Sequence, residues 1–174
     1  MAHSAAHVRD ASRGRALGDY WPLACLIAVC ALAAAAIAHG ASGAITMRSF
    51  MHAYMGVFLL MFATLKLFDL QGFMDGFAMY DLASRIDSRW GYVYPFVELG
   101  LGLAYLAFIA PAITYIVTIA VFLFGAAGVV LALRRGLDIA CPCMGNILKV
   151  PLSTVTLTED LGMAAMAALL LAGV

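Results

Sequence analysis

The chain has 174 residues, of which 65% are hydrophobic and only 11% are charged, and its mean hydropathy is +0.99. Ordinary soluble domains carry about 45–50% apolar and about 25% charged residues, so this chain has too little polar surface for a water-soluble globule. That excludes a soluble enzyme, a disordered chain and a nucleic-acid-binding protein. Because ten basic residues balance ten acidic ones, no overall charge indicates an anionic partner.

The apolar runs are long, and none alternates as a lipid-spanning barrel strand does. They predict an all-α integral membrane bundle, because a helix satisfies its own backbone hydrogen bonds in hydrocarbon. A polar N-terminal segment, residues 1–18, precedes a transmembrane domain, residues 19–174. A span needs about 20 apolar residues, and five stretches are predicted to cross the bilayer: residues 20–38, 50–68, 92–110, 112–133 and 157–174.

The first stretch follows three arginines and ends near Ala36-Ile37-Ala38, as a signal peptide with a cleavage site does. Its apolar run is long for a signal, so we expect an uncleaved helix. Cys25 and Cys30 lie about 140° apart around this helix, at about 100° per residue. They are expected to pack as small apolar side chains.

Methionines recur every four residues at the start of the second stretch, where Met47, Met51 and Met55 accompany His52. Thioethers are ligands for Cu(I), and they also fill cores and face lipid. The packing interpretation is favoured, and a copper relay stays open.

Two charged residues stand inside the apolar stretches, Lys66 in the second and Glu98 in the third. A carboxylate in hydrocarbon is costly and usually faces the bundle interior with a partner. We therefore predict a structural intramembrane ion pair between Lys66 and Glu98, with Asp69 as a second partner on the same helix face. A proton relay or ion path is the alternative. Residues 77–86, in between, are amphipathic and predict a helix on the membrane surface.

The third and fourth stretches meet at Pro111, which lacks a backbone donor and disfavours helix before it, so a tight turn is predicted there. The fifth stretch opens with Thr156-Leu157-Thr158-Glu159, a capping-box pattern that predicts a helix start at Thr156.

Basic residues in the short connections predict the orientation. Eight lie on the side of the N-terminus, and only Arg48 lies on the other. The eight are Arg9, Arg13, Arg15, Arg85, Arg89, Arg134, Arg135 and Lys149. We predict a multi-pass protein of the bacterial inner membrane with its N-terminus in the cytoplasm and its C-terminus outside.

The strongest chemical motif is Cys141–Gly145, the run Cys-Pro-Cys-Met-Gly before the fifth stretch. Two thiols one residue apart can cycle between dithiol and disulfide. They can also bind a soft metal such as Cu(I), with Met144 as a third ligand. The spacing is not the Cys-x-x-Cys of thioredoxin-type proteins. Cys141 and Cys143 are the candidate catalytic residues.

Several groups of residues resemble the DoxX-like membrane fold, which is a four-helix bundle. They are Lys66-Leu67-Phe68, Gly72-Phe73 with Phe77 and Tyr80, and residues 95–103. Arg135-Gly136 followed by Cys141–Gly145 resembles the MauE branch, the methylamine-utilisation membrane proteins. The resemblance covers about residues 50–174, with one helix added in front and with Pro142 and Met144 replacing the commoner small and aromatic residues. It implies a redox association, maturation of a disulfide-rich dehydrogenase subunit and a thioredoxin-like partner.

The sequence thus predicts a membrane protein that handles thiol–disulfide redox equivalents and assists maturation of a partner protein. One alternative is transport or handling of a soft metal, Cu(I) or Hg(II), by Cys141, Cys143 and Met144. Another is a non-catalytic assembly factor. No cofactor motif is evident, and a soft metal ion or a quinone stays open. The expected partners are the lipid bilayer and a thioredoxin-like protein, without nucleic acid, and the oligomeric state stays open.

Overall fold

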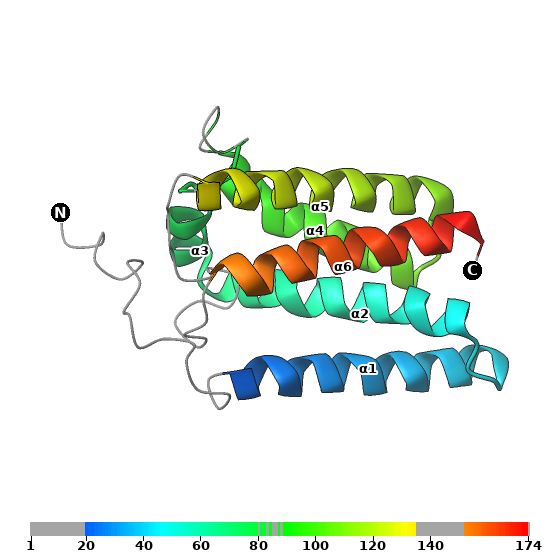
Figure 1. The fold of residues 1–174 in the computed structure, drawn as a ribbon. Coiled ribbons are helices and arrows are strands. Elements are labelled where there is room, and N and C mark those ends of the chain that lie inside the picture. Colours follow the sequence, from blue (N-terminus) through cyan, green and yellow to red (C-terminus); the bar gives the residue numbers. More distant parts are fainter. Residues whose placement is uncertain are drawn as a thin grey trace.

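The computed structural model describes residues 20–79, 81–82, 84, 87, 89–134 and 152–173, without the side chains of residues 42 and 152–155. This described part is all-helical. Its six helices are α1 Trp21–Ser42, α2 Met47–Phe68, α3 Leu70–Phe77, α4 Trp90–Leu106, α5 Pro111–Arg134 and α6 Leu152–Ala172 (Figure 1). The predicted polar segment, residues 1–18, and the motif Cys141–Gly145 lie outside the described residues.

Helices occupy all five stretches that the sequence analysis assigned to the membrane. Three of them, α1, α2 and α5, are long and apolar enough to cross a bilayer. The all-α membrane architecture is therefore confirmed at this level. The crossing of α4, which has 17 residues, and of α6 stays a prediction.

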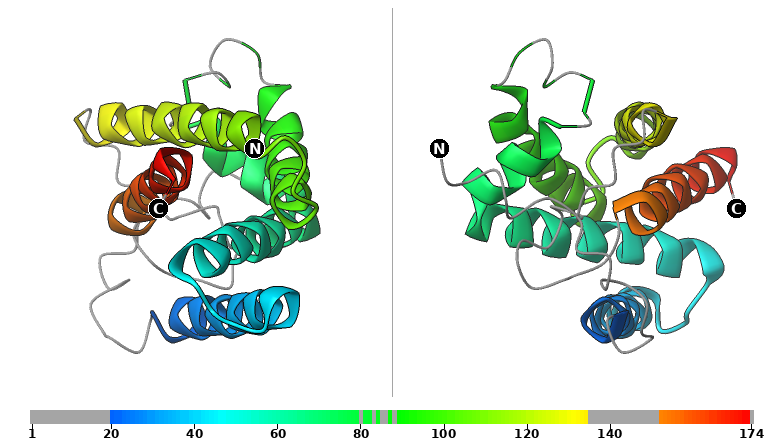
Figure 2. Two further views of the ribbon diagram at one scale, coloured as in Figure 1. Left: turned by 90° about the vertical axis from the view of Figure 1, so that its right-hand side faces the viewer. Right: turned by 60° about the vertical axis from the view of Figure 1, so that its left-hand side comes forward.

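α2 is the centre of the bundle, because it packs against α1, α4 and α6, while α5 packs mainly against α6. Figures 1 and 2 show α1 at one edge of the bundle, beside α2. At the end of the bundle where α3 lies, α1, α4 and α6 begin and α2 and α5 end. We call this the α3 end.

A backbone cap and a side-chain cap set the connection between α1 and α2. Gly43 adopts a left-handed φ of 71° and closes α1 with a hydrogen bond from its N–H to the carbonyl of His39, a common C-terminal device. Thr46 and Ser49 then form a reciprocal capping box at the start of α2. The turn between the two helices is therefore short.

The predicted surface helix at residues 77–86 is wrong, because α3 spans Leu70–Phe77 instead. Asp69 ends α2 and at once caps α3, since its Oδ1 accepts the Gly72 N–H at 3.0 Å. This side-chain cap starts the helix earlier than hydrophobic periodicity indicates. Asp69, which the sequence analysis offered as a second partner of Lys66, is thus the exposed N-cap of α3.

Two predicted helix ends are also wrong. Thr156 is buried within α6, which begins four residues earlier, at Leu152. α4 ends at Leu106, because Phe108 and Ala110 take left-handed φ values of 52° and 40° in the connection. α5 then begins at Pro111, the first-turn position at which a missing N–H costs nothing.

Two glycines let α2 and α4 approach closely. A Cβ on Gly102 would lie 3.0 Å from the Leu60 nitrogen and 3.1 Å from the Gly56 carbonyl oxygen. A Cβ on Gly56 would lie 2.6 Å from a methyl carbon of Leu106. Backbone atoms cannot give way as a flexible side chain can, so this contact depends on the absence of a side chain at Gly102.

We expect Gly102→Ala to lower the unfolding temperature of the protein in mild detergent, with an overpacking cost of about 1–3 kcal/mol. Gly100→Ala on the same helix is the matched control, because a Cβ there meets nothing within 4 Å. Both changes gain the same helix propensity. Equal unfolding temperatures for the two variants would contradict the close approach of α2 and α4.

Candidate functional site

A buried ion pair joins α2 to α4 near the α3 end. Lys66 stands in the last turn of α2 and Glu98 midway along α4, and their side chains are only 3% and 1% exposed. Both carboxylate oxygens of Glu98 lie 2.5 Å from the Lys66 Nζ. The structure thus brings together the two charged residues that the sequence analysis singled out in the apolar stretches.

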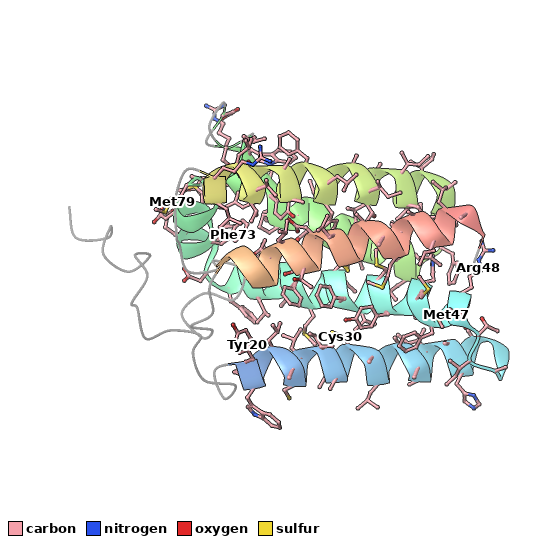
Figure 3. All side chains as sticks on the ribbon, viewed as in Figure 1. Tyr20, Cys30, Met47, Arg48, Phe73 and Met79 are labelled. Atoms are coloured by element: carbon pink, nitrogen blue, oxygen red, sulfur yellow. The ribbon has the colours of Figure 1, made fainter. Side chains whose placement is uncertain are left out.

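Aromatic rings cover the ammonium group. The Lys66 Nζ lies 5.1 Å from the ring centroid of Tyr94 and 5.6 Å from that of Phe73, within the range of cation–π attraction. Tyr94 also hydrogen-bonds to Glu98. Figure 3 labels Phe73 at the α3 end, where α3 closes the bundle. Because both side chains are almost completely buried, the pair acts in a medium of low dielectric constant.

α6 adds further carboxyl groups to the same place. Thr156 and Asp160 are each only 5% exposed, and Glu159 lies beside them. They enclose a cavity of about 10 Å³, which is about the room of one water molecule. We call this cavity the lysine pocket. Its lining residues are Lys66, Phe73, Phe77, Tyr94, Glu98, Gly125, Thr156, Glu159 and Asp160.

The ionisable groups of the lysine pocket come from three helices. Among the described side chains that line it, the ammonium group of Lys66 on α2 lies with the carboxyl groups of Glu98 on α4 and of Glu159 and Asp160 on α6. Asp160 approaches α5 at Gly125, where a Cβ would lie 3.0 Å from its carboxylate oxygen.

A second polar contact, centred on His52, fixes the opposite end of the bundle. His52 is 3% exposed, and its Nε2 lies 2.7 Å from the backbone oxygen of Tyr105. Since a carbonyl only accepts, Nε2 carries the hydrogen, and the neutral ring then accepts the Tyr115 hydroxyl at Nδ1, 2.9 Å away. The ring of Phe108 stacks on His52 at 4.1 Å. This contact ties α2 to both helices flanking the strained α4–α5 connection.

The methionine row does not form one surface. Met47, the first residue of α2, is 67% exposed at the end of the bundle, whereas Met51 and Met55 are buried in the core. Figure 3 shows Met47 and Arg48 at the end opposite α3. Both nitrogens of His52 are engaged in hydrogen bonds. The geometry therefore favours packing over a copper relay.

The cysteines of α1 differ in their surroundings. Cys30 is completely buried and points toward α2 (Figure 3), whereas Cys25 is exposed. The candidate pair Cys141 and Cys143, and with them Met144, lie outside the described residues.

Sequence reasoning missed the contribution of α6 to the lysine pocket. It assigned Glu159 to a helix cap, although Thr156 and Asp160 are four residues apart and therefore share one helix face. Two adjacent acidic residues in an otherwise apolar stretch were the available signal. The structural role of His52 was also missed, because a histidine among methionines is a pattern typical of metal binding.

The comparison with known protein families decides the classification. The family model described as "Methylamine utilisation protein MauE" matches residues 46–173. The chain belongs to the MauE family. The match contains α2–α6, the lysine pocket, the His52 contact and the segment with Cys141 and Cys143, and it begins after α1. The resemblance to MauE is thus confirmed. No curated protein and no solved structure matches the chain.

In this MauE protein, Lys66→Met is expected to be more destabilising than Glu98→Gln. Removing one member of a buried ion pair typically costs about 3–5 kcal/mol. Lys66→Met removes the ammonium group that pairs with the buried Glu98 carboxylate, whereas Glu98→Gln keeps an oxygen acceptor for that ammonium group. Thermal unfolding in detergent measures both, with Arg134→Met, an exposed cation in the last turn of α5, as the control. A Lys66→Met protein with wild-type stability and lost activity would instead indicate a relay.

His52→Leu is expected to cost about 1–3 kcal/mol, because it leaves the buried Tyr105 carbonyl and Tyr115 hydroxyl without their partner. His52→Gln can still donate to the carbonyl and should cost less. Thermal unfolding of the two variants in the same detergent measures the difference. If Gln and Leu are equally tolerated, the hydrogen bonds of His52 contribute nothing to the stability of the bundle.

Proposed function

We propose that this MauE protein exchanges thiol–disulfide redox equivalents at the bacterial inner membrane and thereby assists maturation of a partner protein. Cys141 and Cys143 are the proposed catalytic residues, and a thioredoxin-like protein is the proposed partner. The main support is that the Cys-Pro-Cys run lies within the family match. Methylamine utilisation, which the family's name states, is the setting we propose for it.

The chemistry is a two-step exchange. A thiolate of the reduced pair attacks a disulfide of the partner and forms a mixed disulfide. The second cysteine then displaces the partner's thiol, so that the pair is oxidised and the partner is reduced. In the reverse direction the partner's thiols are oxidised and the pair is reduced. Each direction conserves two electrons and two protons between the two proteins.

The lysine pocket supports this proposal by its position in the chain. The connection that carries Cys141 and Cys143 joins the end of α5 to the start of α6. Both helices contribute to the pocket from the halves next to that connection, through Gly125 on α5 and Thr156, Glu159 and Asp160 on α6. A group of buried carboxyl groups at this end of the bundle can accept the protons that thiols release on oxidation.

Alkylation in sealed membrane vesicles of known orientation tests the proposal. The background is Cys25→Ser with Cys30→Ala, so that only Cys141 and Cys143 react with a membrane-impermeant reagent. We expect labelling to appear only after mild reduction, because the resting pair is a disulfide. The side on which the reagent reacts also measures the orientation, for which the basic residues predict the cytoplasmic face.

Two outcomes contradict the redox role. Labelling without reduction that Cu(I) or Hg(II) blocks would indicate soft-metal handling by Cys141, Cys143 and Met144. Unchanged maturation of the partner with Cys141→Ser and Cys143→Ser together would indicate a non-catalytic assembly factor. Single Ser variants that trap a mixed disulfide with the thioredoxin-like partner would support the exchange.

A further inference from the structure

A groove of about 350 Å³ lies between α1, α2 and α6, beside the lysine pocket. Its lining residues are Leu23, Ile27, Tyr54, Phe58, Phe62, Thr158, Glu159, Gly162, Met163 and Met166. The volume is within the range of about 300–1,000 Å³ that small-molecule sites occupy. α1 lies outside the family match, so one wall of this groove is an addition to the MauE part of the chain.

The groove has one polar end and an aromatic wall. Thr158 and Glu159 stand at the end nearer α3, and Glu159 lines both the groove and the lysine pocket. On α2, Phe58 and Phe62 stack at 4.2 Å between ring centroids, and Tyr54 continues the row at 5.6 Å from Phe58. From Phe62 to Tyr54 the wall is about 12 Å long, at about 1.5 Å per residue.

The chemistry of this groove selects its ligand. A carboxylate and a hydroxyl at the polar end suit a neutral head that exchanges hydrogen bonds, and they disfavour the anionic phosphate of a phospholipid. The stacked rings suit a planar aromatic or quinoid head. The remaining walls are apolar, and two of the three helices that build them, α1 and α2, are long and apolar enough to cross the bilayer, so the walls suit an isoprenoid tail. We infer that the groove binds an isoprenoid quinone.

The quinone site itself does not depend on the proposed function, but the role of the quinone rests on it. A quinone would supply the oxidant that regenerates the disulfide. Two electrons and two protons leave the thiols of Cys141 and Cys143, one S–S bond forms, and the quinone becomes a quinol. The Glu159 carboxyl group, between the groove and the lysine pocket, holds a proton on its way to the quinone oxygen.

Gly162 is the position from which the groove can be filled. It lines the groove, and a Cβ there would meet nothing within 4 Å. Gly162→Leu therefore adds a side chain to the groove at a position that accepts a Cβ without a clash. Gly100→Leu is the matched control, because Gly100 is an exposed helical glycine on α4 whose Cβ also meets nothing within 4 Å.

The experiment is photolabelling of the full chain in phosphatidylcholine nanodiscs by an azido-benzoquinone that carries two isoprene units. Labelled peptides are identified by mass spectrometry. We expect labelling in α2 and α6 that falls by about ten-fold or more in Gly162→Leu, the equivalent of about 1.4 kcal/mol of binding free energy. Labelling in Gly100→Leu should match the wild type.

Three results would overturn the inference. One is equal labelling of the two glycine variants, and another is absence of labelling from α1, α2 and α6. The third is competition by phosphatidylglycerol that is as effective as competition by the unmodified quinone, which would indicate a general lipid groove. The same labelling is repeated with Cys141→Ser and Cys143→Ser. Labelling that persists there keeps the quinone site even if the thiol role fails.

Discussion

The central constraint in this protein is the cost of keeping the ammonium group of Lys66 inside an apolar bundle. An unpaired charge there would cost several kcal/mol, so the surrounding helices must supply its partners. Glu98 on α4 supplies the counter-charge, Phe73 on α3 and Tyr94 on α4 supply ring faces, and α6 supplies further carboxyl groups. Packing of α2 against α4 and α6 therefore follows from electrostatics as much as from apolar area. A large electrostatic contribution to helix packing is expected in a bilayer, where lipid competes for apolar surface.

α2 carries a polar contact near each of its ends. Lys66 and His52 are separated by about 21 Å along the helix, at about 1.5 Å per residue. Between them the close approach of Gly56 and Gly102 holds α2 against α4 without any polar group. His52 closes the far end by binding both sides of the α4–α5 connection, whose left-handed Phe108 and Ala110 would be costly alone. The bundle is thus fixed at three levels by three different interactions.

The long apolar runs made the helices predictable, because length and hydropathy act on every residue of a span. Helix ends were less predictable. Asp69 starts α3 through one hydrogen bond, and the burial of Thr156 cannot be seen in a capping-box pattern. Lys66 and Glu98 stood out because charge is rare in hydrocarbon. Asp160 did not, because its role depends on how α6 turns toward Gly125, which is a tertiary property. The chemistry of Cys141 and Cys143 still rests on their sequence and family.

Glu159 connects the two sites described above. It lines the lysine pocket on one side and the groove under α1 on the other. A disulfide cannot form unless two electrons and two protons leave the thiols, and the acceptor of the electrons need not be the first acceptor of the protons. A carboxyl group between a polar cavity and an apolar groove is suited to pass protons from one to the other. Since α1 builds one wall of that groove and lies outside the MauE match, the groove combines the family part of the chain with a helix that precedes it.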